Sequence, residues 1–308
     1  MTLVRNTHQW RIGDITITRI VEAEGLREPE YMFRGLTPEQ VREQDWLKPH
    51  FATEAGQLIS SIHAFVIEVR DRRIIVDTCV GNDKARRLPR WNMLQTAFLD
   101  DMAAAGYPAE DIDTVLCTHL HVDHVGWNTR FVDGRWIPTF PNARYLFGRI
   151  EFEHWSRGPD PAKTGDAPSA VAENVMECDA IYKDSVRPIV DAGLHDLVES
   201  DHRLTDEIRL EPTPGHSPGH VSVVLSSRGE TAIITGDLMH HPIQCALPEL
   251  ASNFDYDVER ARNTRADFLQ RNCDKPVLIL GTHFATPTAG FIVNDSDGGL
   301  RFNCPRHS

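Results

Sequence analysis

Residues 118–126, with the sequence THLHVDHVG, limit what this chain can fold into more than any other stretch. An apolar run at 114–117 precedes them and predicts a short buried strand. Imidazole and carboxylate groups suit zinc and similar divalent ions, and an H-x-H-x-D alternation projects three donors to one side of an extended loop. A fourth donor turns to the other side, so such a loop can hold two ions. The four donors are His119, His121, Asp123 and His124.

Three further donors each follow, or lie beside, a β-like apolar run. His216 lies in TPGHSPGH, Asp237 in ITGD and His283 in ILGTHF. A glycine near each donor lets the backbone turn sharply. Any one of these histidines alone would be a weak signal. Seven donors at the ends of strand-like runs disfavour the alternative of a solvated, histidine-rich turn.

The order H-x-H-x-D-H, then His, Asp and His, resembles the dinuclear metallo-β-lactamase-fold hydrolases, from about residue 10 to about residue 294. This resemblance implies an α/β fold, a four-layer αββα sandwich forming a single domain over 1–308. It implies one metal on His119, His121 and His216, a second on Asp123, His124 and His283, and Asp237 bridging both. It also implies that Asp77 orients a ligand from behind the metal loop, with a strand-end turn residue as the alternative.

The chemistry of this donor set is consistent with two divalent ions. Three neutral imidazoles leave one ion with its full charge, so a second ion needs the compensation that two carboxylates and a bridging hydroxide provide. Two metals about 3.5 to 4 Å apart lower the pKa of a shared water and hold it as a nucleophile. Zinc is the first expectation for this mixed nitrogen and oxygen set, with manganese, iron or cobalt as alternatives.

The leaving group of a hydrolysis needs a proton, and His240, three residues after Asp237, could supply it or stabilise an oxyanion. The catalytic candidates are therefore Asp123, Asp237 and His240. The alternative for His240 and His241 is that they cap the turn before Pro242, and we favour this alternative only for His241. We expect His220 to begin a strand, and His63 to be a satisfied sheet residue, rather than to bind metal.

Within the superfamily, the sequence resembles the branch of acyl-homoserine-lactone lactonases and methyl parathion hydrolases. The features are ITGD, a long arm before the first core strands and the GTHF ending. The lactonases carry a tyrosine at about the position of His240, so the chain departs from them there. We expect hydrolysis of a small, apolar, ester-like molecule, a lactone first and an organophosphate or carboxylic ester second. The alternative of another class is a catalytically idle metal-binding scaffold, which the retention of all seven donors disfavours.

Periodicity predicts strands at 58–69 and 73–79 and helices at 92–106 and 256–271. Residues 24–57 are irregular and have exposed-looking aromatics, so we interpret them as an arm that packs on a partner copy in a homodimer or as a wall of the pocket. These aromatics are Tyr31, Phe33, Trp46 and Phe51.

Residues 127–201, with a helix expected at 169–182, are interpreted as an inserted cap before His216. The cap and its surroundings offer candidates for lining the pocket, with partly buried core positions as the alternative. They are His154, Trp155, Trp127 and Trp136.

Composition narrows the range of partners. The net charge of −13 disfavours a nucleic acid, and we interpret Arg86, Arg87 and Arg90 as a solvated face. The six cysteines contain no C-x-x-C pair, which argues against a zinc ribbon or a redox dithiol, and Cys79 and Cys117 fit a core. No apolar run approaches the roughly 18 residues of a membrane span. We therefore expect a cytoplasmic enzyme that acts on a small molecule.

Overall fold

The computed structural model describes residues 8–156, 178–296 and 298–304. The chain divides into two compact units. Unit 1 comprises Met1–Glu22 and Ile62–Glu199, and unit 2 comprises Ala23–Ser61 and Ser200–Ser308. Two of the three crossings between units fall inside strands, β2 (Ile15–Arg27) and β3 (Leu58–Val69). The single domain over 1–308 stays a prediction.

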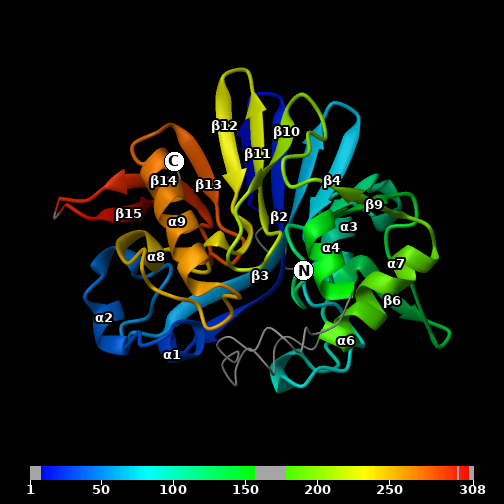
Figure 1. The fold of residues 1–308 in the computed structure, drawn as a ribbon, viewed down its shortest axis with the longest axis horizontal. Helices are drawn as coiled ribbons and strands as arrows, with labels where there is room; N and C mark the ends of the chain where they lie inside the picture. Colours follow the sequence, from blue (N-terminus) through cyan, green and yellow to red (C-terminus); the bar gives the residue numbers. More distant parts are fainter. Residues whose placement is uncertain (1–7, 157–177, 297, 305–308) are drawn as a thin grey trace. The chain divides into compact units, whose positions relative to one another are not determined.

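The first sheet has seven strands in the order β1-β2-β3-β4-β5-β8-β9 (Figure 1). Its remaining strands are β1 (Gln9–Ile12), β4 (Arg72–Val76), β5 (Thr114–Leu116), β8 (Arg144–Gly148) and β9 (His195–Val198). Strand β3 has the predicted bounds, because its long apolar run is buried almost throughout. Strands β4, β5, β8 and β9 pair in parallel, so their carboxyl ends meet at one edge of the sheet. The loops after β4 and β5 both begin at that edge.

Several short elements surround this sheet in unit 1. They are the hairpin β6 (Thr129–Val132) and β7 (Arg135–Pro138), α3 (Phe98–Ala104), α4 (Arg149–Ser156), α6 (Cys178–Ile181), the π-helical turn η5 (Tyr182–Val186), α7 (Arg187–Asp191), and the 3-10 turns η2 (Pro89–Trp91), η3 (Ala109–Asp111) and η4 (Gly126–Asn128). The helix predicted at 92–106 is shorter, because Met93 has a left-handed φ of 52° and the Thr96 amide donates to Asn82 Oδ1 at 2.8 Å.

The predicted cap at 127–201 contributes to the sheet itself, since β8 and β9 are two of its parallel strands. The segments outside the sheet are the β6–β7 hairpin and the helices between β8 and β9. Of the helix predicted at 169–182, residues 169–177 lie outside the described residues, and the rest forms α6 and the start of η5.

The predicted solvated face of arginines is wrong for Arg86. Its side chain is buried and makes a two-pronged ion pair with Asp184, at 2.7 and 2.9 Å. Arg87 and Arg90 are exposed, as expected. The six cysteines are free, and the predicted burial of Cys79 and Cys117 is confirmed.

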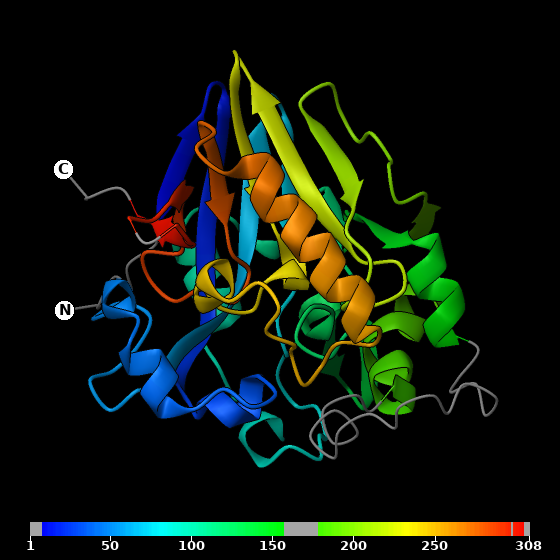
Figure 2. The ribbon, with the colours of Figure 1, turned by 60° about the vertical axis from the view of Figure 1, so that its left-hand side comes forward.

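The second sheet lies in unit 2 and has six strands in sequence order, β10 to β15. They are β10 (Ile208–Pro212), β11 (Val221–Ser227), β12 (Glu230–Ile234), β13 (Val277–Leu280), β14 (Ala289–Asn294) and β15 (Leu300–Asn303). Only β12 and β13 pair in parallel, and their connection contains η6 (Gly236–Leu238), α8 (Ile243–Ala246) and the predicted amphipathic helix α9 (Val258–Asn272). Helix α9 lies along the sheet and buries Phe268 and Leu269 with Ile233 and Ile279 (Figures 1 and 2).

Residues 24–57, the predicted arm, form α1 (Pro29–Met32), α2 (Pro38–Arg42) and η1 (Asp45–Leu47). The expectation of exposed aromatics is wrong for Phe33 and Phe51, which lie in the core of unit 2. The ring of Phe51 packs edge-on against Phe284 at 6.3 Å and Phe302 at 6.0 Å. Tyr31 and Trp46 are partly exposed, and a homodimer stays a prediction. Among the described helices, none has the length and apolar character that a bilayer crossing requires.

Candidate metal centre

The loop after β5 carries the first four predicted ligands and is braced by the loop after β4. The Thr78 amide donates to the His124 carbonyl at 2.7 Å, and the Gly126 amide donates to the Cys79 carbonyl at 2.7 Å. A side chain at Gly126 would place its Cβ 1.9 Å from the Val80 carbonyl oxygen, so only glycine permits this close approach. The glycine that ends the THLHVDHVG motif therefore fixes the backbone of the loop.

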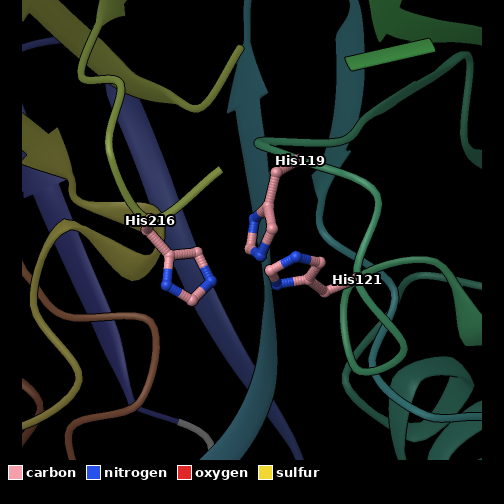
Figure 3. A group of neighbouring side chains, drawn as sticks. All are labelled: His119, His121 and His216. Carbon is pink, nitrogen blue, oxygen red and sulfur yellow. The ribbon is translucent and has the colours of Figure 1, made fainter. Parts of the chain in front are cut away.

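The imidazoles of this loop gather within unit 1. The ring centroid of His119 lies 4.4 Å from that of His121 and 4.0 Å from that of His124. The Nε2 atom of His124 lies 3.6 Å from Asp123 Oδ1. Figure 3 shows His119 and His121 on this loop with their rings turned toward each other. It also labels His216, which comes from the loop between β10 and β11 in unit 2.

Asp77 orients two of these rings, which confirms the prediction that it lies behind the loop. Its Oδ2 lies 2.9 Å from His124 Nδ1, and it accepts hydrogen bonds from the amide and the hydroxyl of Thr118 at 2.8 to 3.1 Å. Because the Thr118 hydroxyl donates to Asp77, its oxygen can accept from His119 Nδ1, 3.1 Å away. A proton held on Nδ1 in this way leaves Nε2 as the basic nitrogen of both rings.

Unit 2 supplies the other three predicted ligands, and Asp237 lies at their centre. Its Oδ2 is 3.2 Å from His216 Nε2, and its Oδ1 is 3.1 Å from His283 Nε2. Asp237 follows β12 and His283 follows β13, so the parallel pairing of these strands brings the two residues together. Each oxygen of the Asp237 carboxylate thus faces a different histidine.

The same tautomer is favoured for two histidines of unit 2, His216 and His283. His216 Nδ1 lies 3.2 Å from Asp255 Oδ1, and His283 Nδ1 lies 2.9 Å from the Ser61 carbonyl. Burial raises the pKa of Asp255, an effect that His240 opposes. Asp255 was missed by the sequence analysis, because it resembles any aspartate before a helix and lies 39 positions from its partner.

Two neighbouring histidines have structural roles, as the sequence predicted. His220 immediately precedes β11, and its Nε2 accepts from the Asp237 amide at 2.8 Å, which fixes the backbone of Asp237. His241 Nε2 donates to the Phe51 carbonyl at 2.8 Å, and its Nδ1 accepts from the Ile243 amide at 3.2 Å. Burial lowers the pKa of His241 to about 4. His63, in β3, is buried against Phe65, with ring centroids 4.8 Å apart.

His240 lies beside the carboxylate of Asp237, with Nε2 3.4 Å from Oδ2. Its ring is 3% exposed and stacks on that of His283 at 5.9 Å. The donor atoms of His216, Asp237 and His240 lie within 4.8 Å of one another. The geometry of unit 2 therefore suits His240 both for donating a proton near Asp237 and for binding a metal.

The residues present fit divalent metal ions. Four histidines from the two units have Nδ1 beside a hydrogen-bond acceptor, and two of them direct Nε2 at a shared carboxylate. Such outer contacts are typical of histidines that bind metals through Nε2. The four are His119, His124, His216 and His283.

A sequence model described as the metallo-beta-lactamase superfamily matches residues 59–283, which is most of the chain. The chain belongs to the metallo-beta-lactamase superfamily. The α/β fold that the family resemblance implied is thereby confirmed.

Two named relatives of the chain are distant in sequence. An N-acyl homoserine lactonase from Bacillus sp is 23% identical over 186 residues, which are 56% of this chain and 61% of that protein. The chain thus spans about three fifths of that relative. A probable metallo-hydrolase, Mb2322c from Mycobacterium bovis, is 23% identical over 249 residues, 72% of this chain and 74% of that protein.

Two solved structures share the fold along nearly the whole chain. The hydrolase AbOPH in the beta lactamase superfamily superposes with a TM-score of 0.79 at 24% identity, and covers 98% of both chains. AidC, a dizinc quorum-quenching lactonase in complex with a product, also has a TM-score of 0.79, at 18% identity and 98% coverage of both chains. At these identities the likeness concerns the superfamily fold alone.

A recess lies in unit 1, beside the loop that follows β5. It is small and partly open to solvent, and its wall includes Leu120, His121, Trp155, Ile181, Tyr182 and Val186. The other lining candidates are elsewhere. Trp127 is buried and donates to Glu22 Oε1 at 2.6 Å, Trp136 lies over Lys84, and His154 packs edge-on against Trp155 at 4.5 Å.

Proposed function

We propose that this chain is a dinuclear metal-dependent hydrolase of a small, apolar, ester-like molecule, with a lactone as its first substrate. The observation that carries the proposal is the Asp237 carboxylate, whose two oxygens face the Nε2 atoms of His216 and His283 separately. In this proposal His119, His121 and His216 would hold one ion, and Asp123, His124 and His283 would hold the other. Asp237 would contribute to both.

Zinc is the proposed metal. The donors suit it, and the neighbour AidC is named as a dizinc lactonase. When bound, the two ions would supply a water of lowered pKa and would polarise the substrate carbonyl. Behind the ligands, Asp77 in unit 1 keeps His124 in the tautomer that can bind a metal, and Asp255 in unit 2 does the same for His216.

The leaving group needs a proton at the end of the reaction, and His240 is the proposed donor. Its Nε2 lies 3.4 Å from Asp237 Oδ2, so the ring lies beside a proposed metal ligand. In a lactone the leaving oxygen stays attached to the product, so one proton transfer to it completes ring opening.

A lactone is preferred over other esters on two grounds. The curated relatives from Bacillus are named N-acyl homoserine lactonases, and the recess beside His121 is lined by apolar side chains. A cytoplasmic location and a homodimer also belong to this proposal and rest on the sequence alone.

The test is a hydrolysis assay of the zinc-loaded protein with a panel of N-acyl homoserine lactones, p-nitrophenyl acetate and a phosphotriester. We expect the lactones to have the highest kcat/KM. Asp237→Asn should abolish turnover and lower the zinc content, whereas Asp267→Asn, at an exposed position on α9, should change neither. His240→Gln should lower kcat about 100-fold or more while two zinc ions remain bound.

Other results would redirect the proposal. A higher kcat/KM for the phosphotriester or the acetate ester would remove the lactone assignment and keep the hydrolase. Loss of zinc in His240→Gln would make His240 a ligand rather than a proton donor. Absence of turnover on every substrate by the zinc-loaded protein would favour a metal-binding scaffold.

A further inference from the structure

Glu22 lies in β2, and its buried side chain joins three other segments of unit 1. The carboxylate accepts four hydrogen bonds from groups that carry no charge. They come from the amides of Val80 and Gly81, at 2.8 and 3.1 Å, from the Thr96 hydroxyl at 3.4 Å and from the Trp127 indole at 2.6 Å. Burial raises the pKa of the Glu22 carboxyl, and all four hydrogen bonds oppose this shift because they favour the ionised form. Partners 58 to 105 positions away in the sequence therefore meet at one charge.

The loop after β4 meets this carboxylate in an unusual backbone conformation. Asp77, Cys79 and Gly81 have left-handed φ angles of 57°, 51° and 80°. Alternating left-handed residues turn successive amides to one side of the chain, where together they bind an anion. Glycine adopts such an angle freely, whereas in cysteine the angle is strained and persists only where the surroundings hold it. The carboxylate of Glu22, which accepts from the amides of Val80 and Gly81, is the anion in this position.

The loop held in this way is the one that braces the proposed ligands of unit 1. Thr78, two residues before Val80, donates its amide to the His124 carbonyl at 2.7 Å. The Thr78 carbonyl in turn accepts from the Trp127 amide at 2.7 Å. The Val80 carbonyl packs against Gly126 so closely that no side chain fits there. A displacement of Val80 is therefore passed on to the backbone of His124.

The indole donor connects Glu22 to the other end of the ligand loop. Trp127 directly follows THLHVDHVG, and its ring is stacked on that of Phe98, with the centroids 5.7 Å apart. Phe98 begins α3, and both rings are buried. Trp127 cannot turn away without leaving a buried carboxylate short of a donor, which is unfavourable. Glu22 therefore fixes the loop after β4 and the end of the ligand loop relative to each other.

We propose that Glu22 is a positioning residue for the metal centre. Its carboxylate holds the loop after β4 against the loop that carries the first four proposed ligands, and so raises the affinity of these ligands for the metal. This inference rests on the metal centre of the proposed function. Glu22 acts through the backbone, whereas Asp77 acts on an imidazole directly. A buried charge surrounded by its donors fixes one arrangement of the chain, because any other leaves the charge without partners.

The test compares the zinc affinities of folded variants by competition with a chelator. Glu22→Gln keeps the size of the side chain but turns an NH2 group toward the Val80 amide or toward the donors of Gly81 and Trp127. We expect the zinc affinity to be about tenfold lower. Glu22→Asp keeps the charge but is one methylene shorter, so it should restore the affinity only in part. Glu24→Gln, at an exposed position of the same strand, should leave the affinity unchanged.

A second control separates positioning from a general loss of stability. Ile15→Val shortens a fully buried side chain earlier in β2, so it should lower the melting temperature and keep the zinc affinity. Amide hydrogen exchange of the metal-free protein gives a readout without zinc. The amides of Val80 and Gly81 should exchange faster in Glu22→Gln and at the wild-type rate in Ile15→Val. Should Glu22→Gln fail to fold by circular dichroism, Trp127→Phe removes one donor, keeps a ring against Phe98 and should give a smaller loss of zinc affinity.

The outcomes separate this inference from the proposed function. Equal zinc affinities in the wild-type protein, Glu22→Gln and Trp127→Phe would overturn the inference, even if lactones are hydrolysed. An equal loss of affinity in Ile15→Val would also overturn it, because reduced stability would then explain the effect. Full restoration by Glu22→Asp would assign the effect to charge and refute positioning. The expected loss of zinc affinity in a protein that hydrolyses no ester would uphold the role of Glu22 and refute the hydrolase.

Discussion

At the scale of single residues, the two halves of the proposed centre have the same design. In each, a histidine that points Nε2 inward has its Nδ1 held by a buried carboxylate, Asp77 for His124 and Asp255 for His216. The position of the proton on an imidazole decides which nitrogen can bind a metal, so these carboxylates matter as much as the ligands. Asp77 influences a second histidine as well, because the Thr118 hydroxyl links it to His119.

We therefore predict that Asp77→Asn lowers zinc affinity about 10- to 100-fold. An amide NH2 facing His124 Nδ1 would favour the tautomer that carries its proton on Nε2, which cannot bind metal. Asparagine tolerates the left-handed φ of 57° at this position, so the backbone should be retained. Competition with a chromophoric chelator measures the affinity. Asp71→Asn, in the exposed turn before β4, is the control, and equal affinities in the two variants would contradict the prediction.

At the scale of elements, the segment 24–57 joins unit 2 through one buried histidine. The Nε2 of His241 donates to the Phe51 carbonyl, and the two rings pack edge-on at 6.2 Å. Only the neutral ring fits, and burial lowers its pKa from 6.5 to about 4. Between these two pH values the unfolded chain binds a proton that the folded chain does not bind, so stability falls as the pH falls through this window.

We predict that His241→Gln removes this pH dependence. The free energy of unfolding of the wild-type protein should decrease by up to about 3 kcal/mol more than that of the variant between pH 6.5 and pH 4. The amide of glutamine can still donate to the Phe51 carbonyl but does not titrate. Urea unfolding at several pH values gives the comparison, with the exposed His50→Gln as control. Parallel pH profiles of the wild-type protein and His241→Gln would refute the explanation.

The sequence predicted those elements and ligands whose signals are local. Strand β3 and helix α9 follow from unbroken periodicity, and the donors stand out because each lies at the end of a strand. The features that could not be predicted from the sequence depend on contacts between residues far apart in the chain. Arg86 is buried because Asp184, 98 positions on, neutralises it, and Phe51 is buried by Phe302. Strand β9, with the sequence HDLV, is short and half-exposed, so it has little pattern of its own.

At the scale of the whole molecule, the proposed ligands come from both units, four from unit 1 and three from unit 2. We predict that zinc removal by a chelator lowers the melting temperature, because bound metal stabilises only the folded chain. Each site, at a thousandfold excess of zinc over its Kd, adds about 4 kcal/mol. Zinc should restore the melting temperature, whereas magnesium, which prefers oxygen ligands, should not. An unaltered melting temperature after chelation would contradict the proposed metal centre.

The interleaving of the two units has a consequence for synthesis on the ribosome. Phe51 packs against Phe302, which is translated 251 positions later. At ordinary elongation rates this interval lasts roughly 12 to 50 seconds. During this interval, the strands that will bury the apolar side chains of residues 33–51 have not yet been translated. The nascent chain therefore exposes an apolar segment during most of its translation. We expect the yield of folded protein in cells to depend on chaperones that bind this segment until the last strand has been translated.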